Sequence, residues 1–199
     1  MKGLKLLTLL ILIICLCGCN TKMLTAEQSK KNFDLYESSL NKTASNFNMS
    51  LNEIPNPEGQ YDGYKVGWRD FEINIDENQK IEIGVSNYAS ESGKGTEFFC
   101  ITYSIENFKD NAEYNLPLFV ELVNDLAGRT LTVDFCEEFL NAPEDKYSAE
   151  GYGHEKTDDE VIAKRKPFGF FDDWNIYYTL TKDGTSTFEY CGLTKMSSS

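Results

Sequence analysis

Alternating apolar residues on either side of a short polar turn constrain the fold more than any other feature of the sequence. Ile73 precedes the turn at residues 76–79, and Ile81 and Ile83 follow it, with polar residues between them. Apolar residues at every second position are typical of a strand with one buried face, so this pattern predicts an antiparallel hairpin. Residues 98–105 are apolar on both faces, which predicts a central strand of the same sheet.

Further alternating runs predict the remaining strands. A three-residue step separates Trp68 from Phe71, which are apolar residues of the run before the turn, and predicts a β-bulge between them. Residues 174–180 and 187–193 alternate on either side of a Lys-Asp-Gly turn. They predict a second hairpin near the C-terminus.

Two longer segments carry the apolar spacing of helices. Thr25 can cap a helix over residues 26–49, in which apolar side chains recur every three or four positions. A second helix is predicted over residues 116–127, with Pro117 near its start.

Two shorter helices are predicted in the second half of the chain. Residues 131–135 alternate like a strand, but the apolar residues that follow keep helical spacing, so a helix from Thr132 is the preferred interpretation. Thr157 and Glu160 fit a capping box, which predicts a short helix that ends near Arg165.

The order of these elements predicts an α+β fold. We expect a single antiparallel sheet of about five strands, with an N-terminal helix and two to three further helices packed on it. The chain has 199 residues, of which 41% are hydrophobic, and this suits one globular domain, which we place at residues 26–196.

The N-terminus carries a different pattern. Lys2 and Lys5 precede residues 6–16, which are almost entirely aliphatic. A short basic segment followed by an apolar one is typical of a secretory signal. A permanent transmembrane anchor is the alternative, but the 13 residues from 6 to 18 fall short of the length that a spanning helix needs, about 20 residues.

This apolar segment ends in Leu16-Cys17-Gly18-Cys19. The motif resembles the lipobox of bacterial lipoprotein precursors, in which an aliphatic residue and two small residues precede a cysteine. The resemblance implies that Cys19 carries a diacylglyceryl group after cleavage just before it. Residues 1–18 are then a signal peptide and residues 19–25 a lipidated tether. An ordinary secretory cleavage beside the cysteines is the alternative.

A lipid anchor predicts a location on the extracytoplasmic face of a bacterial cell membrane, because two or three acyl chains bind a bilayer firmly. The formal net charge is −13, and removal of residues 1–18, which hold two lysines and no acids, makes it −15. This charge argues against nucleic acid as a partner, because phosphate contacts need clustered basic residues.

Three cysteines remain in the predicted domain. They allow at most one disulfide, and the predicted compartment permits one. Cys100 and Cys191 lie in predicted strands and could be neighbours across the sheet, whereas Cys136 lies in a predicted helix. Buried thiols that pack as small apolar groups are the preferred interpretation of all three.

Few residues could carry catalysis or hold a metal. His154 is the single histidine, and the sequence contains no G-x-S-x-G, HExxH or phosphate-loop motif. Pairs of acids at 137–138, 158–159 and 172–173 are interpreted as solvated side chains. We therefore predict no cofactor and no catalytic set. A weak calcium site is an alternative for one group of acids: Glu144, Asp145, Glu155, Asp158 and Asp159.

Aromatic residues are dense between Phe168 and Trp174, which predicts either a strand entry in the core or an aromatic groove for a peptide or glycan. The residues expected to line such a groove are Trp174, Tyr152 and Tyr177. The leading hypothesis is thus a membrane-anchored lipoprotein with a non-enzymatic domain that binds an envelope protein, peptide or glycan.

Two other functions remain open on the sequence. One is a domain that binds a small ligand or an ion. The other is a cell-envelope hydrolase in which an acidic side chain acts as acid or base, with three candidates: Asp172, Asp173 and Glu155.

Overall fold

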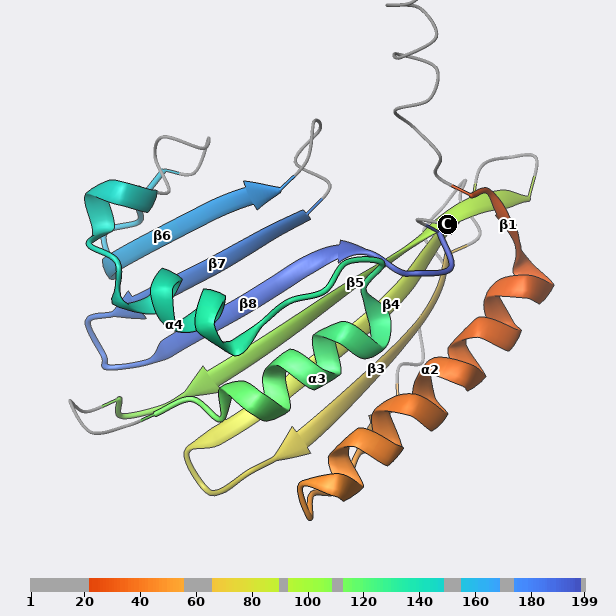
Figure 1. Ribbon diagram of the computed structural model, residues 1–199, viewed down its shortest axis with the longest axis horizontal. Helices are drawn as coiled ribbons and strands as arrows, with labels where there is room; N and C mark the ends of the chain where they lie inside the picture. The colour runs from red at the N-terminus through yellow and green to blue at the C-terminus, as the bar shows by residue number, and fades with distance from the viewer. Residues whose placement is uncertain are drawn as a thin grey trace, which may run out of the picture.

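The computed structural model describes residues 22–55, 66–89, 93–108, 113–148, 155–168 and 174–197. These residues form one antiparallel sheet with its helices on one side (Figure 1). The α+β class and the single antiparallel sheet are therefore confirmed, but the described sheet has eight strands rather than about five. Along the chain the strands are β1 (Leu24–Thr25), β2 (Asn52–Ile54), β3 (Val66–Asn74), β4 (Gln79–Ala89), β5 (Lys94–Ile105), β6 (Glu160–Phe168), β7 (Trp174–Thr181) and β8 (Ser186–Leu193).

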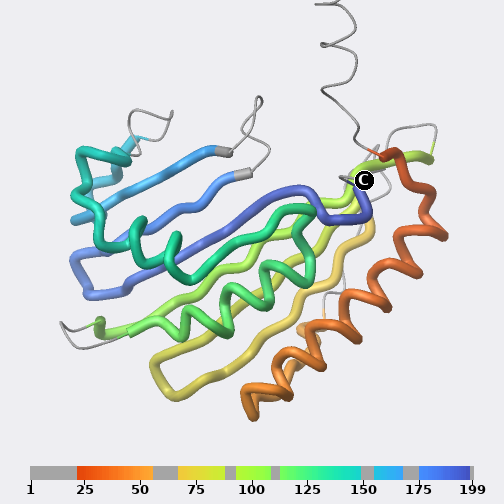
Figure 2. Tube along the Cα trace, viewed as in Figure 1, coloured from red at the N-terminus to blue at the C-terminus, as the bar shows by residue number. Residues whose placement is uncertain are grey.

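The sheet consists of a four-stranded meander, β2 to β5, and a three-stranded meander, β6 to β8, which meet between β5 and β8. Its order is β2-β3-β4-β5-β8-β7-β6, and β1 also pairs with β5. The chain passes from the first meander to the second through α3 (Leu116–Leu126), α4 (Val133–Asn141) and the 3₁₀-helix η1 (Glu144–Tyr147). The tube in Figure 2 follows this path across the face of the sheet.

Each α-helix begins at a side chain that caps its first turn. Thr25 forms a capping box with Gln28 at the start of α2 (Ala26–Asn46). The Asn115 side chain accepts a hydrogen bond from the backbone of Leu118 in α3, and Thr132 caps α4 in the same way. These bonds satisfy amide groups that have no partner within a helix. Three of the four predicted helix starts are therefore confirmed.

The helices bury only one face of the sheet. Along β5, the inward side chains of Phe99, Ile101 and Tyr103 are at most 2% exposed, while Phe98 and Thr102 on the other face are half-buried. An antiparallel sheet with one covered face has this alternation. Burial of each large inward side chain contributes about 1.5–3 kcal/mol, so this layer between sheet and helices is the main source of stability.

The predicted helix over residues 157–165 is wrong, because the chain enters β6 instead. The Thr157 amide does donate to the Glu160 carboxylate at 2.7 Å, as in a capping box, but the segment closes as a turn. Residues 160–168 then pair with β7. Pairing with β7 and burial of the Lys164 side chain override the local helix signal.

The predicted β-bulge between Trp68 and Phe71 is also wrong. β3 and β4 pair without a register shift from Val66 to Asn74, so Trp68 and Phe71 lie on opposite faces of one regular strand. The bulge that the described residues do contain is in β6, between Glu160 and Ile162.

The ends of the described chain meet beside the start of β5. β1, which belongs to the predicted tether, pairs with Gly95 and Lys94, and the Lys22 amide donates to the Ser197 carbonyl at 2.7 Å. The buried Glu97 carboxylate accepts hydrogen bonds here from three side chains, Asn32, Tyr36 and Thr194. Within the described residues, no helix is long and apolar enough to cross a membrane.

Candidate binding groove

A groove with a volume of about 500 Å³ lies between the start of α3, α4 and β7. This volume is within the range of small-molecule binding sites. Four aliphatic residues of the two helices form its walls, namely Leu116, Pro117, Val133 and Leu140. Aromatic rings supply the remaining apolar surface, from Phe108, Tyr114 and Tyr178.

Tyr114 is the centre of the aromatic surface. Its ring packs edge-on against Tyr103 with centroids 4.9 Å apart, and it lies 5.6 Å from Phe188 and 6.5 Å from Tyr178. Its hydroxyl is hydrogen-bonded to the Ser186 hydroxyl at 2.5 Å. These contacts hold the ring in one orientation, so this part of the groove is formed before any ligand arrives.

The same aromatic cluster holds the start of α3. The Tyr103 hydroxyl accepts from the Asn115 amide at 3.1 Å and donates to Gln79 at 2.8 Å. The next amide of the chain, that of Leu116, donates to the Tyr114 carbonyl, and Pro117 has none. The Leu118 amide donates to the capping side chain. Because these groups are occupied, the helix start offers an anion few of the donors that usually bind one.

The end of α4, the opposite wall, is held by a buried lysine. Lys164 of β6 is 3% exposed, and its ammonium donates to the carbonyls of Phe139, Leu140 and Ala142 at 3.0, 2.5 and 3.1 Å. It also lies 4.9 Å from the centre of the Tyr178 ring. Carbonyls at a helix end lack partners within the helix, so Lys164 caps α4 and fixes it against the sheet.

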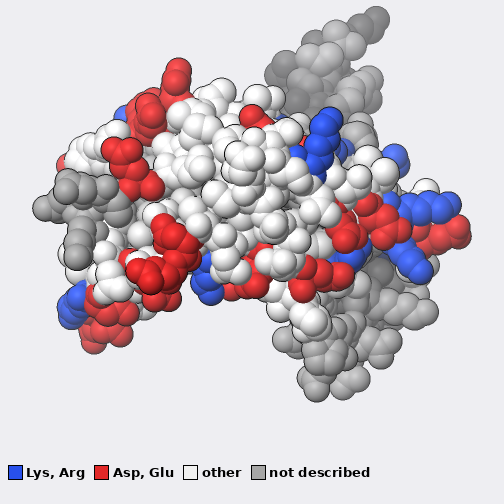
Figure 3. All heavy atoms as spheres, turned by 90° about the horizontal axis from the view of Figure 1, so that it is seen from below, with Lys and Arg blue, Asp and Glu red and all other residues white. Residues whose placement is uncertain are grey.

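Acidic and polar side chains form the rim. Glu113, Glu137 and Asn141 are exposed there, and no lysine or arginine is among the described residues that line the groove. Neither carboxylate makes a hydrogen bond or ion pair with a described residue. On the face of the molecule seen from below, acidic side chains lie at several places with fewer basic ones between them (Figure 3). The groove therefore combines apolar walls with a negatively charged entrance.

The titratable groups next to the groove are suited to packing rather than to proton transfer. Burial raises the pKa of the Tyr114 phenol far above its usual range, and Ser186 offsets this only in part. Burial also raises the pKa of the Cys136 thiol on α4 to about 12. Both groups are neutral at pH 7, and Cys136 is the buried free thiol that the sequence predicts.

Only one of the three predicted binding residues has a described side chain, and it lies outside the groove. Tyr177 pairs with Glu189 on the face of the sheet opposite the helices, and its hydroxyl donates to Glu160 at 3.2 Å. Its neighbour Tyr178 lines the groove instead. Tyr152 and the Trp174 side chain are outside the described residues, as is Cys19.

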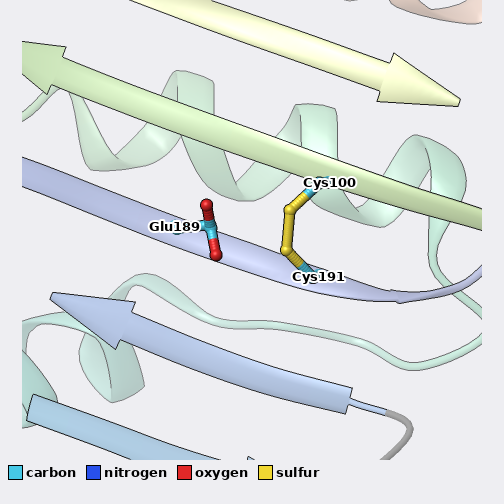
Figure 4. Close-up of side chains that lie close together, drawn as sticks. All are labelled: Cys100, Glu189 and Cys191. Atoms are coloured by element: carbon cyan, nitrogen blue, oxygen red, sulfur yellow. A yellow bond between two sulfur atoms is a disulfide. The ribbon is translucent and has the colours of Figure 1, made fainter. Parts of the chain in front are cut away.

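The preferred interpretation of three free thiols is wrong for two of them. Cys100 of β5 and Cys191 of β8 are cross-strand partners joined by a disulfide, with Cα atoms 4.1 Å apart. Glu189 lies beside them on the uncovered face (Figure 4). Burial raises the pKa of this carboxyl, and a hydrogen bond from Thr102 opposes the shift. These are the only three potential metal ligands that converge among the described residues, and both sulfurs are already bonded.

The proposed calcium site does not form. Glu144 instead accepts from the Lys156 ammonium at 2.7 Å and from the Ala163 amide at 3.1 Å, which joins η1 to β6. Among the described residues, no two of the other four acidic side chains come close enough to Glu144 to bind a metal ion together with it. Of the hydrolase candidates, Glu155 is exposed, and Asp172 and Asp173 lie outside the described residues, as does His154.

Comparison with known proteins gives no relative: no family model, no curated protein and no solved structure matches this chain.

Proposed function

We propose that the protein is a lipid-anchored binding protein on the extracytoplasmic face of a bacterial membrane, and that its domain holds a small ligand in the groove between α3, α4 and β7. The observation that carries this proposal is the groove, about 500 Å³ in volume, in which aliphatic walls and rings fixed by their own contacts lie beside a few polar and acidic groups. Concave apolar sites with a few polar groups are the usual form of small-molecule sites.

The disulfide supports the proposed compartment. Cys100 and Cys191 are bonded across β5 and β8, and structural disulfides persist in oxidising compartments such as the outer side of a bacterial membrane. Both cysteines follow the proposed cleavage site in sequence, so they belong to the exported domain.

The position of the groove suits a protein held by Cys19. Three residues of chain from Cys19 to Lys22 span at most about 11 Å, so a lipid on Cys19 holds the end with β1 and the C-terminus close to the bilayer. The start of α3 and α4 lie toward the other end of the molecule (Figure 1). In this arrangement the elements that form the groove lie at the end of the molecule far from the membrane surface.

A groove-filling variant tests the binding function. Val133 is half-buried in the wall, and Val133→Trp places a large ring in the groove. A thermal-shift screen of a library of small envelope metabolites, run on the wild type and the variant, should give compounds that stabilise only the wild type. A compound at one hundred times its dissociation constant adds about 2.7 kcal/mol to the free energy of unfolding. Equal shifts in both proteins, or none in either, would contradict the proposal.

The anchor is tested separately on the full-length chain. We expect the wild type to stay with membranes in high salt and to enter solution only with detergent, because acyl chains hold it through apolar contacts. Cys19→Ser removes the sulfur that would carry the lipid, and it should block this retention while Cys17→Ser leaves it intact. Equal behaviour of the two variants would contradict the anchor.

A further inference from the structure

We infer that the groove selects small amines, that is, ligands with an apolar body and a positively charged end. This inference rests on the proposed binding function and names the chemical class of its ligand.

The walls and rings determine the body of the ligand. The apolar residues that line the groove are partly shielded from water: Leu116 and Tyr178 are buried, and Val133, Leu140 and Tyr114 are half-buried. An apolar group of a ligand that packs against them removes further apolar surface from water. Such burial is worth roughly 25 cal/mol for each Å² of apolar surface removed from water. The volume accommodates a single ring or a short alkyl chain with its end group rather than an extended polymer.

The rim determines the charge of the other end. Glu113 on the segment before α3 and Glu137 on α4 face this entrance from two sides, and neither is engaged by a described residue. Carboxylates attract an ammonium group and repel a carboxylate at the same position. Aromatic rings such as Phe108 add to this preference, because their faces attract cations.

The positive groups beside the groove that the structure describes are already occupied, so they do not reverse this preference. The ammonium of Lys164 donates three hydrogen bonds to carbonyl groups at the end of α4. The first amides of α3 are used by Tyr114 and Asn115. An anionic ligand would therefore meet two carboxylates without a compensating positive charge among the described lining residues.

Three ligands with one body and different ends test the inference. Phenethylamine, 2-phenylethanol and 3-phenylpropanoate share the phenyl group and carry an ammonium, a hydroxyl and a carboxylate. They are titrated by ligand-observed NMR against the full-length protein in phosphatidylcholine nanodiscs, with empty nanodiscs subtracted. We expect the amine to bind about three- to tenfold more tightly than the alcohol, as for one or two exposed ion pairs, and the carboxylate to bind weakest.

Matched variants identify the source of the preference. The double variant Glu113→Gln, Glu137→Gln should bring the amine and the alcohol to equal affinity. Glu121→Gln, which changes the same charge on an exposed position of α3 outside the lining, should leave the preference intact. High salt should weaken the amine more than the alcohol, because exposed charges are screened.

The outcomes separate the two proposals. Equal binding of all three ligands, lost in Val133→Trp, would overturn the selection of amines and leave the binding function standing. Binding of none of the three would also overturn the inference, and the library screen then decides on the binding function independently.

Discussion

Two buried charges, one at each end of the molecule, illustrate how the chain separates stability from binding. Glu97, beside the meeting point of the chain ends, is a carboxylate held by three neutral donors. Lys164, beside the groove, is an ammonium held by three backbone carbonyls. Neither has an oppositely charged hydrogen-bond partner within the described chain.

The two sites differ in what they hold. The partners of Glu97 are core side chains of α2 and the C-terminal segment, far from the groove. The partners of Lys164 belong to the end of α4, which is a wall of the groove. Both buried side chains therefore stabilise the fold through their hydrogen bonds. Only Lys164 also holds a wall of the groove, so only Lys164 couples the stability of the fold to the shape of the binding site.

The largest expected effect is at Glu97. Glu97→Ala leaves the Asn32, Tyr36 and Thr194 donors without an acceptor in a dry site, which we expect to cost about 3 kcal/mol of unfolding free energy. Urea denaturation measures this loss. Glu97→Gln keeps one acceptor and should lose less. Affinity for phenethylamine should not change in either variant, and a loss of less than about 0.5 kcal/mol in the alanine variant would contradict the structural role.

Lys164 should show a smaller loss of stability together with a loss of binding. Lys164→Met keeps the apolar stem but removes the cap of α4, at an expected cost of about 2 kcal/mol. The freed helix end should also weaken phenethylamine binding, measured by the same titration. If Lys164→Met destabilises the protein but leaves its affinity for phenethylamine unchanged, Lys164 does not couple the stability of the fold to the shape of the groove.

The pH dependence of stability sharpens the account of Lys164. Burial lowers the pKa of its ammonium to about 8, against roughly 10.4 in an unfolded chain. Between about pH 8 and about pH 10, Lys164 therefore binds a proton more tightly in the unfolded protein than in the folded one. The unfolding free energy of the wild type relative to Lys164→Met should therefore rise from about pH 8 to about pH 10 and stay level below pH 7. A relative stability that falls across this range would contradict the assignment.

The smallest expected effect on stability is at the rim. Glu137→Gln removes an exposed carboxylate that has no partner among the described residues, so the unfolding free energy should change by less than about 0.5 kcal/mol. The preference for phenethylamine over 2-phenylethanol should nevertheless fall, because one of two attracting charges is gone. A large loss of stability would show that Glu137 belongs with the structural charges instead.

Regular patterns made much of the fold predictable. The alternation through Ile73, Ile81 and Ile83 correctly predicts the β3–β4 hairpin, and capping residues such as Thr25 and Thr132 locate helix starts. These signals are local, so they depend little on the rest of the chain. β1 and β2 were missed because strands of two and three residues carry no periodicity. The sequence does not predict β6, because a lysine in the middle of a strand is not expected to be buried. The carbonyl groups that stabilise Lys164 belong to α4, which is distant in sequence and so contributes nothing to a local pattern.

The site was less predictable, because its residues come together only through the sheet. Tyr177 and Tyr178 are adjacent in sequence, so their side chains lie on opposite faces of the sheet. The sequence does not indicate which of the two faces the helices cover. The sequence favours free thiols over the disulfide, because the register of Cys100 against Cys191 depends on two strands whose cysteines are 91 residues apart. Only the acidic rim has a sequence signal, the negative net charge, and that signal does not locate it.

Intermolecular NOEs between phenethylamine and tyrosine rings test the central claim most directly. With the tyrosines labelled and assigned by substitution, the account predicts contacts from the ligand's phenyl protons to Tyr114 and Tyr178, on the helix side of the sheet, and none to Tyr177 on the other side. Contacts to Tyr177, or no contacts to Tyr114 and Tyr178 at saturating ligand, would contradict it.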